Sequence, residues 1–157
     1  MIKKFKTFEA EDYDNKHGDR FWGDSGAGVL IYCKPTKRFL IPFRSRSVNE
    51  PHTYGIFGGA MDEGETPEES AERELVEESG YNGKFELFPA YIYVSPNKTF
   101  TYYNFLGLIE KEFNPEEDWE TESSEWYTYQ ELLDLEPKHF GLKLFLEESK
   151  SLIEKNL

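Results

Sequence analysis

Three glutamates in the middle of the chain stand at spacings that place their carboxylates on one side of a helix. Glu74, Glu77 and Glu78 lie three and four residues apart, and side chains at these spacings are neighbours on a helical surface. Such like charges repel one another by roughly 0.2 to 0.5 kcal/mol per pair in an isolated helix. A divalent cation would relieve the repulsion, because Mg²⁺ prefers oxygen ligands and keeps positions for water and phosphate. The alternative is a solvated face on which Arg73 pairs with a glutamate one turn away.

The loop before these glutamates favours a binding site over a solvated face. Gly58, Gly59 and Gly64 allow the backbone to adopt unusual dihedral angles and to approach a ligand or ion closely. Residues 66–69, Thr-Pro-Glu-Glu, then combine a capping box with a proline at the first helical position. Gly80 is the corresponding stop signal. These signals predict a helix between residues 66 and 80 that carries the three carboxylates beside a glycine turn.

The glycines and charged residues together reproduce the Nudix box, Gly-x5-Glu-x7-Arg-Glu-U-x-Glu-Glu-x-Gly-U, in which U is aliphatic. The chain therefore resembles the Nudix (MutT-like) hydrolase superfamily. It departs from the box at Tyr81, where an aliphatic residue is usual, and Phe57 stands where many relatives carry proline. Both departures concern packing or the local turn. The matching positions are Gly59, Glu65, Arg73, Glu74, Leu75, Glu77, Glu78 and Gly80.

The resemblance implies a fold, a reaction and a set of metal ligands. The fold is an α/β/α sandwich, with a central mixed β-sheet between the box helix and a C-terminal helix. The reaction is Mg²⁺-dependent hydrolysis of a phosphoanhydride bond, with Mn²⁺ as a substitute ion. The chemistry of this hydrolysis is consistent with a metal, because it needs neutralisation of the phosphate charge and a positioned water. By similarity, Glu77 and Glu78 are metal ligands, Glu74 is a ligand or the general base, and the Gly59 carbonyl is a further ligand.

Four more side chains are expected near the carboxylates. By similarity, Glu65 and Arg73 brace the loop and the helix, and Arg73 supports catalysis by pairing with a glutamate. Arg44 and Arg46 follow a predicted strand, and either guanidinium could bind a substrate phosphate through paired hydrogen bonds. Because an exposed loop arginine often has no such role, these two are substrate-binding candidates only.

An acidic stretch from Asn114 to Glu122 is the candidate for a long loop beside the site. Relatives use a glutamate from a distal loop as a metal ligand or general base. Glu120, six residues before Trp126, matches that position best, and Glu122 is the alternative. Since the whole stretch is acidic, either carboxylate could equally be a solvated surface charge.

The composition narrows the class of partner. The chain has 31 acidic and 18 basic residues, and its net charge of −13 argues against electrostatic capture of a nucleic acid. Aromatic residues make up 17% of the sequence, enough for a ring-rich core and a stacking site. No apolar stretch is long enough for a signal peptide or a membrane span. We therefore expect a cytoplasmic protein that binds a small-molecule nucleotide, without nucleic acid or membrane partners, and a homodimer stays open.

One domain over residues 1–157 is expected to position the site. Short β-rich runs between turn residues predict strands, and a helical repeat of apolar residues predicts a second helix whose stripe faces the core. The strands are expected at 27–33, 38–43, 84–94, 99–109 and 125–129, and the second helix at 141–155.

The substrate is indicated less directly than the reaction. ADP-ribose pyrophosphatases of this superfamily commonly carry a proline about sixteen residues after the last box glycine, and Pro96 lies at that distance from Gly80. This favours ADP-ribose or another nucleotide sugar over (deoxy)nucleoside triphosphates, although an ordinary turn also accounts for the proline. A noncatalytic Nudix-fold ligand sensor is an alternative from another class. An isopentenyl-diphosphate isomerase needs a catalytic cysteine, whereas the single Cys33 lies in an apolar run.

Overall fold

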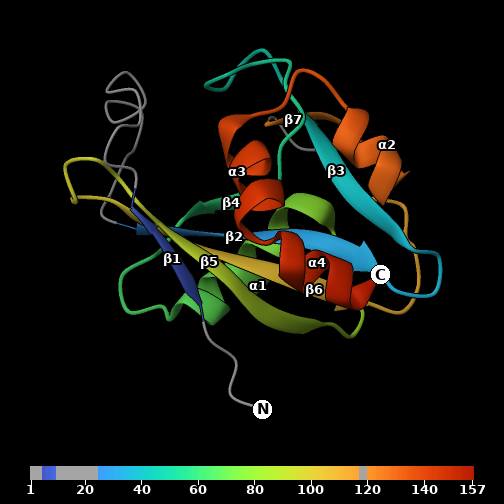
Figure 1. Cartoon of the computed structure of the whole chain (residues 1–157), viewed down its shortest axis with the longest axis horizontal. Coiled ribbons are helices and arrows are strands. Elements are labelled where there is room, and N and C mark those ends of the chain that lie inside the picture. Colours follow the sequence, from blue (N-terminus) through green and yellow to red (C-terminus); the bar gives the residue numbers. More distant parts are fainter. Residues whose placement is uncertain (1–4, 10–24, 117–119) are drawn as a thin grey trace.

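The computed structural model describes residues 5–9, 25–116 and 120–157, and Figure 1 shows the whole chain. Its strands are β1 (Lys6–Glu9), β2 (Ser25–Cys33), β3 (Arg38–Arg44), β4 (Phe57–Ala60), β5 (Glu86–Val94), β6 (Thr101–Ile109) and β7 (Thr121–Thr128). Its helices are α1 (Pro67–Ser79), α2 (Tyr129–Asp134), α3 (Phe140–Glu148) and α4 (Lys150–Asn156). Among the described residues, no helix has both the length and the apolar character that crossing a membrane requires.

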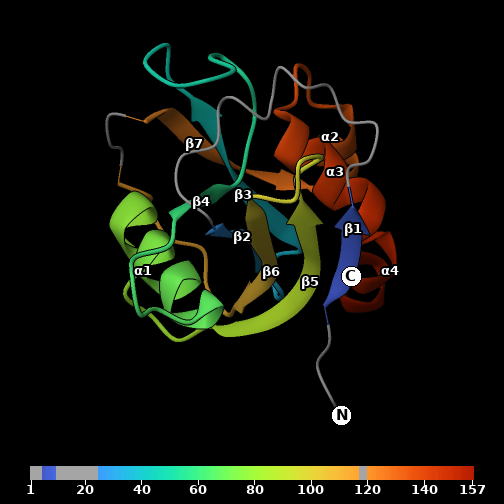
Figure 2. The same cartoon turned by 90° about the vertical axis from the view of Figure 1, so that its left-hand side faces the viewer.

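The strands form one mixed sheet in the order β1-β5-β6-β2-β3-β7, and β4 pairs with β2 outside this path. The pairs β1–β5 and β2–β6 are parallel, while β2–β3, β2–β4, β3–β7 and β5–β6 are antiparallel. Figure 2 shows the sheet edge-on, with α1 on one side and α3 and α4 on the other. The expected α/β/α sandwich with a central mixed sheet is therefore confirmed.

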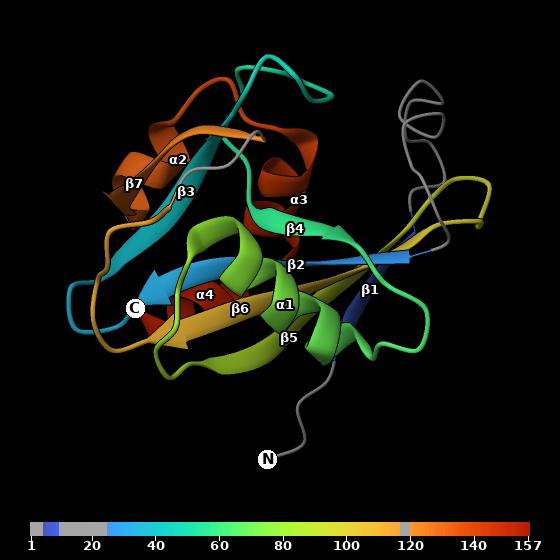
Figure 3. The ribbon, with the colours of Figure 1, turned by 180° about the vertical axis from the view of Figure 1, so that it is seen from behind.

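β2 is buried on both of its faces, as a central strand of such a sandwich must be. Successive side chains of a strand point to opposite faces, so Leu30 and Tyr32 join one core cluster while Val29 and Ile31 join the other. Figure 3, which views the molecule from behind, shows α1 in front of β2 and β6. The first cluster also contains Leu142 and Phe145 of α3 and Ile153 of α4, and the second contains Ala71 and Leu75 of α1.

The box helix α1 has the ends that the sequence predicts. The Thr66 side chain accepts a hydrogen bond from the Glu69 amide, and the Glu69 carboxylate accepts one from the Thr66 amide. Pro67 occupies the first turn, and Gly80 ends the helix in the left-handed conformation with a φ of 74°. These local contacts fix where the helix begins, and therefore which way the three glutamates face.

Several elements differ from the prediction. β1, β4 and α2 were not predicted, and β7 begins at Thr121 rather than at Glu125. The predicted helix over 141–155 is two helices, α3 and α4, which meet at Ser149 with a φ of −112° and a ψ of 20°. The apolar stripe still faces the core, because Leu142, Phe145, Leu146 and Ile153 are all buried.

Candidate active site

Arg73 lies among the carboxylates that the sequence places on α1 and in the loop before it. Its Nε and Nη2 donate to the Glu65 carboxylate over 2.8 and 2.9 Å, and Nη2 also donates to the Ala60 carbonyl over 3.1 Å. Its Nη1 donates to Glu74 over 3.0 Å and to Glu77 over 3.2 Å. One guanidinium therefore ties β4 and its loop to two glutamates of α1. Glu65 and Arg73 thus have the contacts expected of residues that brace the site.

The contact with Arg73 has a consequence for acid stability. Hydrogen bonds from the Arg73 side chain, and then from the Asp62 amide, lower the pKa of Glu65 to about 2. The folded-state pKa is therefore below the unfolded value, so this contribution to stability is complete above about pH 4.5 and is lost as the pH falls towards 2. We expect Glu65→Gln to be less stable than the parent at neutral pH and to lose less stability on acidification.

Thermal unfolding measured at intervals between about pH 6 and pH 2 tests this expectation. Glu63→Gln, which changes an exposed carboxylate of the same loop, is the matched control and should keep the acid dependence of the parent. A Glu65→Gln profile that runs parallel to that of the parent over the whole range would show that the ion pair does not stabilise the fold.

Glu78 is the most deeply buried glutamate of the site, with 7% of its surface exposed. Its Oε1 accepts a hydrogen bond from the Gly58 amide over 2.7 Å, which fixes the carboxylate against β4. Burial raises the pKa of Glu78 well above its usual value, and the nearby charges of Glu120 and Glu74 raise it further. The distal glutamate thus lies close to the box helix, as its spacing to Trp126 predicts.

The glycines of β4 pack directly beneath these carboxylates. A Cβ on Gly59 would lie 2.7 Å from Oε1 of Glu74, so any larger residue there would displace the Glu74 carboxylate. A Cβ placed on Gly26 of β2 would lie 2.8 Å from the Gly59 carbonyl oxygen, so this oxygen points towards β2. In an antiparallel strand, the amide and the carbonyl of one residue point to the same side, and the next residue points both to the other side. The Gly58 amide donates to Glu78 of α1, so the Gly58 carbonyl also points towards α1. The ligand role of the Gly59 carbonyl stays a prediction, and the Gly58 carbonyl is a second candidate.

The chemistry of this donor set fits a divalent cation. Glu74, Glu78 and Glu120 offer carboxylate oxygens, and burial and mutual repulsion disfavour the charge of Glu78. Hard oxygen donors with excess negative charge are the ligands that Mg²⁺ and Mn²⁺ accept. Within the ranges that the structure describes, no three acidic, histidine or cysteine side chains already have the spacing of a metal site. Arg73 instead holds Glu74 and Glu77, so the side chains would have to turn to bind an ion.

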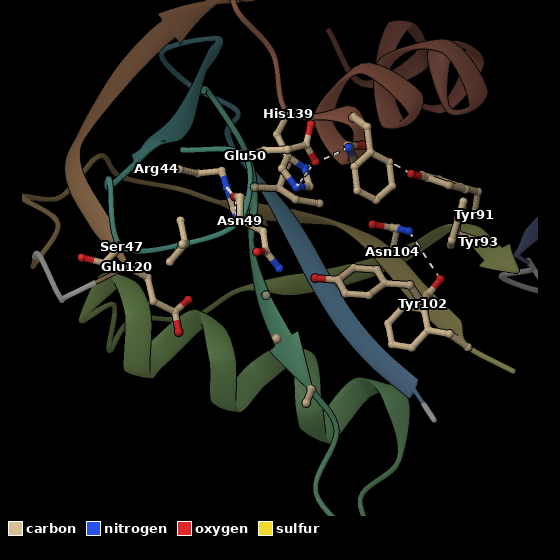
Figure 4. A pocket seen from close by; sticks show the side chains of 18 residues that line it. Arg44, Ser47, Asn49, Glu50, Tyr91, Tyr93, Tyr102, Asn104, Glu120 and His139 are labelled. Carbon is tan, nitrogen blue, oxygen red and sulfur yellow. Dashed lines mark hydrogen bonds and ion pairs between the residues drawn. The ribbon is translucent and has the colours of Figure 1, made fainter. Parts of the chain in front are cut away.

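A cavity of about 410 Å³ opens beside the carboxylates (Figure 4). Gly58, Gly59 and Glu120 line one side of it, together with the loop between β3 and β4. Its remaining walls come from β5, β6 and the start of α3, and they are rich in aromatic rings. The aromatic wall residues are Tyr91, Tyr93, Phe100, Tyr102 and Phe140. The cavity thus has the size and lining typical of a small-molecule site, and one of its edges is acidic.

The predicted phosphate-binding arginines have different positions. Arg44 lines the cavity, where its Nε and Nη2 donate to the Asn49 carbonyl over 3.1 and 2.6 Å. Burial lowers the pKa of Arg44, and the charge of Glu50 partly offsets that effect. Arg46 is exposed and does not line the cavity. Of the two candidates, only Arg44 is therefore placed to meet a ligand in the cavity.

The two candidate glutamates of the acidic stretch have different surroundings. Glu120 lines the cavity, and its carbonyl accepts a hydrogen bond from the Ser45 amide over 2.9 Å. Glu122 is exposed on β7, 3.6 Å from Nε2 of His52. Residues 117–119, which belong to the expected long loop, lie outside the described residues. The geometry therefore brings Glu120, and not Glu122, to the cavity.

His139, Glu50 and Asn104 are polar cavity residues that were not predicted. His139 Nδ1 accepts a hydrogen bond from the Gly141 amide at the start of α3, and its Nε2 lies 3.1 Å from the Glu50 carboxylate. Asn104 stands in β6 with 1% of its surface exposed. A single amide within the apolar run from 101 to 109 was the available signal, because an apolar strand seldom contains a buried polar side chain without a reason.

Comparisons with known proteins agree with this architecture. A family model described as the NUDIX domain matches residues 24–148. A Mycobacterium tuberculosis protein, described as a candidate 8-oxo-dGTP diphosphatase, is 37% identical over 71 residues. The match covers 43% of this chain and 33% of that protein, so the chain spans about a third of the length of this relative.

Two solved structures share the fold at low sequence identity. The Mycobacterium smegmatis Nudix hydrolase RenU superposes with a TM-score of 0.74 at 22% identity, covering 86% of this chain and 89% of RenU. The NUDIX domain of Shewanella oneidensis NrtR, solved with ADP ribose, gives 0.67 at 15% identity, covering 90% and 94%. Since the family model matches most of the sequence and the box helix carries its glutamates, the chain belongs to the NUDIX family.

Proposed function

We propose that this protein hydrolyses a phosphoanhydride bond of a nucleotide, with Mg²⁺ or Mn²⁺ as cofactor. The observation that carries the proposal is that Glu120 and β4 line the aromatic cavity, while Glu78 lies close enough to feel the Glu120 charge and accepts a hydrogen bond from Gly58 of β4. A base and ribose in the cavity would bring their phosphates to the carboxylates. Without a cation those phosphates would be repelled, so the arrangement is suited to a substrate that binds together with one.

Each residue of the site has a proposed task. Glu74, Glu77, Glu78 and Glu120, with the Gly58 or Gly59 carbonyl, would hold the cation. When bound, it neutralises phosphate charge and lowers the pKa of a water molecule. Glu120 or Glu74 accepts a proton from the attacking water, and Arg44 binds a phosphate oxygen from the cavity wall. Arg73 and Glu65 hold α1 and β4 in their relative positions during the reaction.

A divalent cation is also expected to raise the thermal stability of the protein. An ion that binds only the folded state stabilises it by mass action, and here it would also reduce the repulsion among Glu74, Glu78 and Glu120. At about a hundred times its dissociation constant, Mg²⁺ should raise the Tm by roughly 5 to 10 °C. Differential scanning fluorimetry with NaCl at equal ionic strength as the control measures this shift. No shift, together with no calorimetric heat of binding, would favour the solvated-face interpretation.

For the substrate, we propose ADP-ribose or another nucleoside diphosphate linked to a second moiety. The position of Pro96 supports this class, as does the likeness of the fold to a NUDIX domain that was solved with ADP ribose. Pro96 itself lies in the turn between β5 and β6 and does not line the cavity, so its support is indirect. A (deoxy)nucleoside triphosphate is the second candidate, favoured by the partial match to the Mycobacterium tuberculosis protein.

A hydrolysis screen with Mg²⁺ tests the reaction and the substrate class together. ADP-ribose, NADH, diadenosine polyphosphates and (deoxy)nucleoside triphosphates, including 8-oxo-dGTP, are incubated with the enzyme, and products are identified by mass spectrometry. ADP-ribose should give AMP and ribose 5-phosphate. Release of a nucleoside monophosphate and pyrophosphate from triphosphates alone would select the second candidate. Binding without turnover of any compound would indicate a noncatalytic ligand sensor.

A further inference from the structure

Asn104 is a buried polar side chain that the reaction chemistry leaves without a task. It lies on β6, with 1% of its surface exposed, and it lines the cavity. Phe105 and Leu106, which follow it on the strand, are buried and apolar. A buried amide costs free energy unless its donors and acceptors have partners. A carboxamide at this position therefore indicates a hydrogen-bonding partner inside the cavity.

The hydrogen bond to the backbone fixes which end of the amide faces the cavity. Nδ2 of Asn104 donates to the Tyr102 carbonyl over 3.4 Å. The opposite orientation would place two acceptor oxygens against each other, so the network determines the positions of nitrogen and oxygen. Figure 4 shows the remaining oxygen, Oδ1, directed towards the centre of the cavity. This bond to the Tyr102 carbonyl uses the nitrogen of the amide and leaves Oδ1 available to accept from a ligand.

Two nitrogen-bearing side chains of the cavity, Arg44 and His139, already contact other groups. The Arg44 guanidinium donates to the Asn49 carbonyl, and the His139 imidazole lies against the Glu50 carboxylate. The rest of the wall near Asn104 is aromatic, with Tyr93 and Phe140 nearby and 6.0 Å between their ring centroids. A ligand that stacks on such rings and also presents an N–H group in its plane is a nucleobase.

Asn104 and Glu120 lie on opposite sides of the cavity in Figure 4. A nucleotide whose phosphates reach the acidic edge would therefore place its base, the part furthest from the phosphates, beside Asn104. We propose that Asn104 Oδ1 accepts a hydrogen bond from the exocyclic amino group of the substrate's nucleobase. The site then selects bases that carry this amino group over their oxo counterparts. This assignment rests on the proposed function for the orientation of the nucleotide.

Equilibrium binding of nucleoside monophosphates tests the assignment in the intact chain with Mg²⁺. IMP is the matched partner of AMP, XMP of GMP and UMP of CMP, because each carries an oxo group where its partner carries the exocyclic amino group. For the base that the site prefers, we expect the amino form to bind at least about tenfold more tightly than its partner, the effect of one hydrogen bond to a site built for it. Equal affinities within every pair would overturn the proposal without any variant.

Asn104→Ala and Asn104→Leu should abolish this preference by weakening the amino form and leaving the oxo form unchanged. Two variants are used because leucine keeps more of the buried volume than alanine does, and a thermal melt confirms that each is folded. Tyr91→Phe is the matched control. Its hydroxyl is in the same cavity but already donates to the Gly141 carbonyl over 3.4 Å, so its loss should affect both forms equally.

An equal loss for amino and oxo forms in the Asn104 variants would place the amide against the ribose and would refute base selection. The hydrolysis screen separates this failure from failure of the proposed function. Base-selective binding without turnover of any compound would reject the proposed hydrolysis and support the assignment of Asn104. Turnover with equal use of amino and oxo bases would support the hydrolysis and reject the assignment.

Discussion

Glu78→Gln is expected to reduce kcat/KM by at least about a hundredfold, because it removes the charge of a proposed metal ligand. The glutamine oxygen can still accept the hydrogen bond from the Gly58 amide, so the position of the side chain should be kept. In the absence of a cation the variant should be at least as stable as the parent. Burial and the nearby Glu120 and Glu74 carboxylates disfavour the charge that the substitution removes. Activity and stability are thus expected to change in opposite directions.

Steady-state kinetics at saturating Mg²⁺ and a thermal melt without divalent ions measure the two effects. Glu77→Gln, which changes a predicted ligand that Arg73 holds, should show a similar loss of activity. Glu72→Gln is the matched control, because Glu72 is exposed and lies on the opposite side of α1. Near-normal activity in both the Glu77 and Glu78 variants would refute the metal assignment.

Glu120→Gln is expected to reduce turnover by about a hundred- to ten-thousandfold if this carboxylate is the general base. Glu120 lines the cavity, and its charge is near enough to raise the pKa of Glu78. Its backbone is held by the Ser45 amide, and the strand that follows is anchored by Trp126, whose Nε1 donates to the Phe113 carbonyl over 3.1 Å. These contacts fix the backbone that carries the Glu120 side chain at the cavity.

Two neighbouring carboxylates are the controls for Glu120. Glu122 is exposed beside His52, and Glu116 packs near Gly80 at the end of α1, so neither lines the cavity. Glu122→Gln and Glu116→Gln should each change turnover little. Equal small losses in all three variants would show that no single distal carboxylate acts as the base, and a loss confined to Glu122→Gln would transfer the role to that residue.

The parts of the site that the sequence predicts best are those fixed by nearby residues. The ends of α1 follow from Thr66 and Glu69, whose side chains accept from each other's backbone amides, and from Gly80, whose amide donates to the Val76 carbonyl. The spacing of the glutamates then fixes which face carries them. Contacts within about a turn of the chain need no knowledge of the rest of the fold, so a pattern of residue types is enough to predict them.

The parts that the sequence did not reveal depend on distant partners. β4 has two glycines and little β propensity, and it is a strand because β2 pairs with it. Gly58 was interpreted as room for a ligand, but a Cβ there would lie 2.0 Å from the Tyr102 hydroxyl, so it also makes room for that ring. Asn104 on β6 and His139 at the start of α3 become cavity residues only when the fold brings these distant segments to the same cavity.

The central position of β2 also affects how the chain reaches its fold. Its parallel pairing joins Ser25 to Thr101 and Cys33 to Ile109, whereas its hairpin with β3 is local. Pairing of such distant segments incurs loop-closure entropy before the contacts form, which slows folding relative to a helical bundle. During synthesis on the ribosome, β2 emerges well before β6. The apolar side chains on both faces of β2 therefore stay exposed until β6 has been synthesised, and the nascent chain is prone to aggregation during this interval.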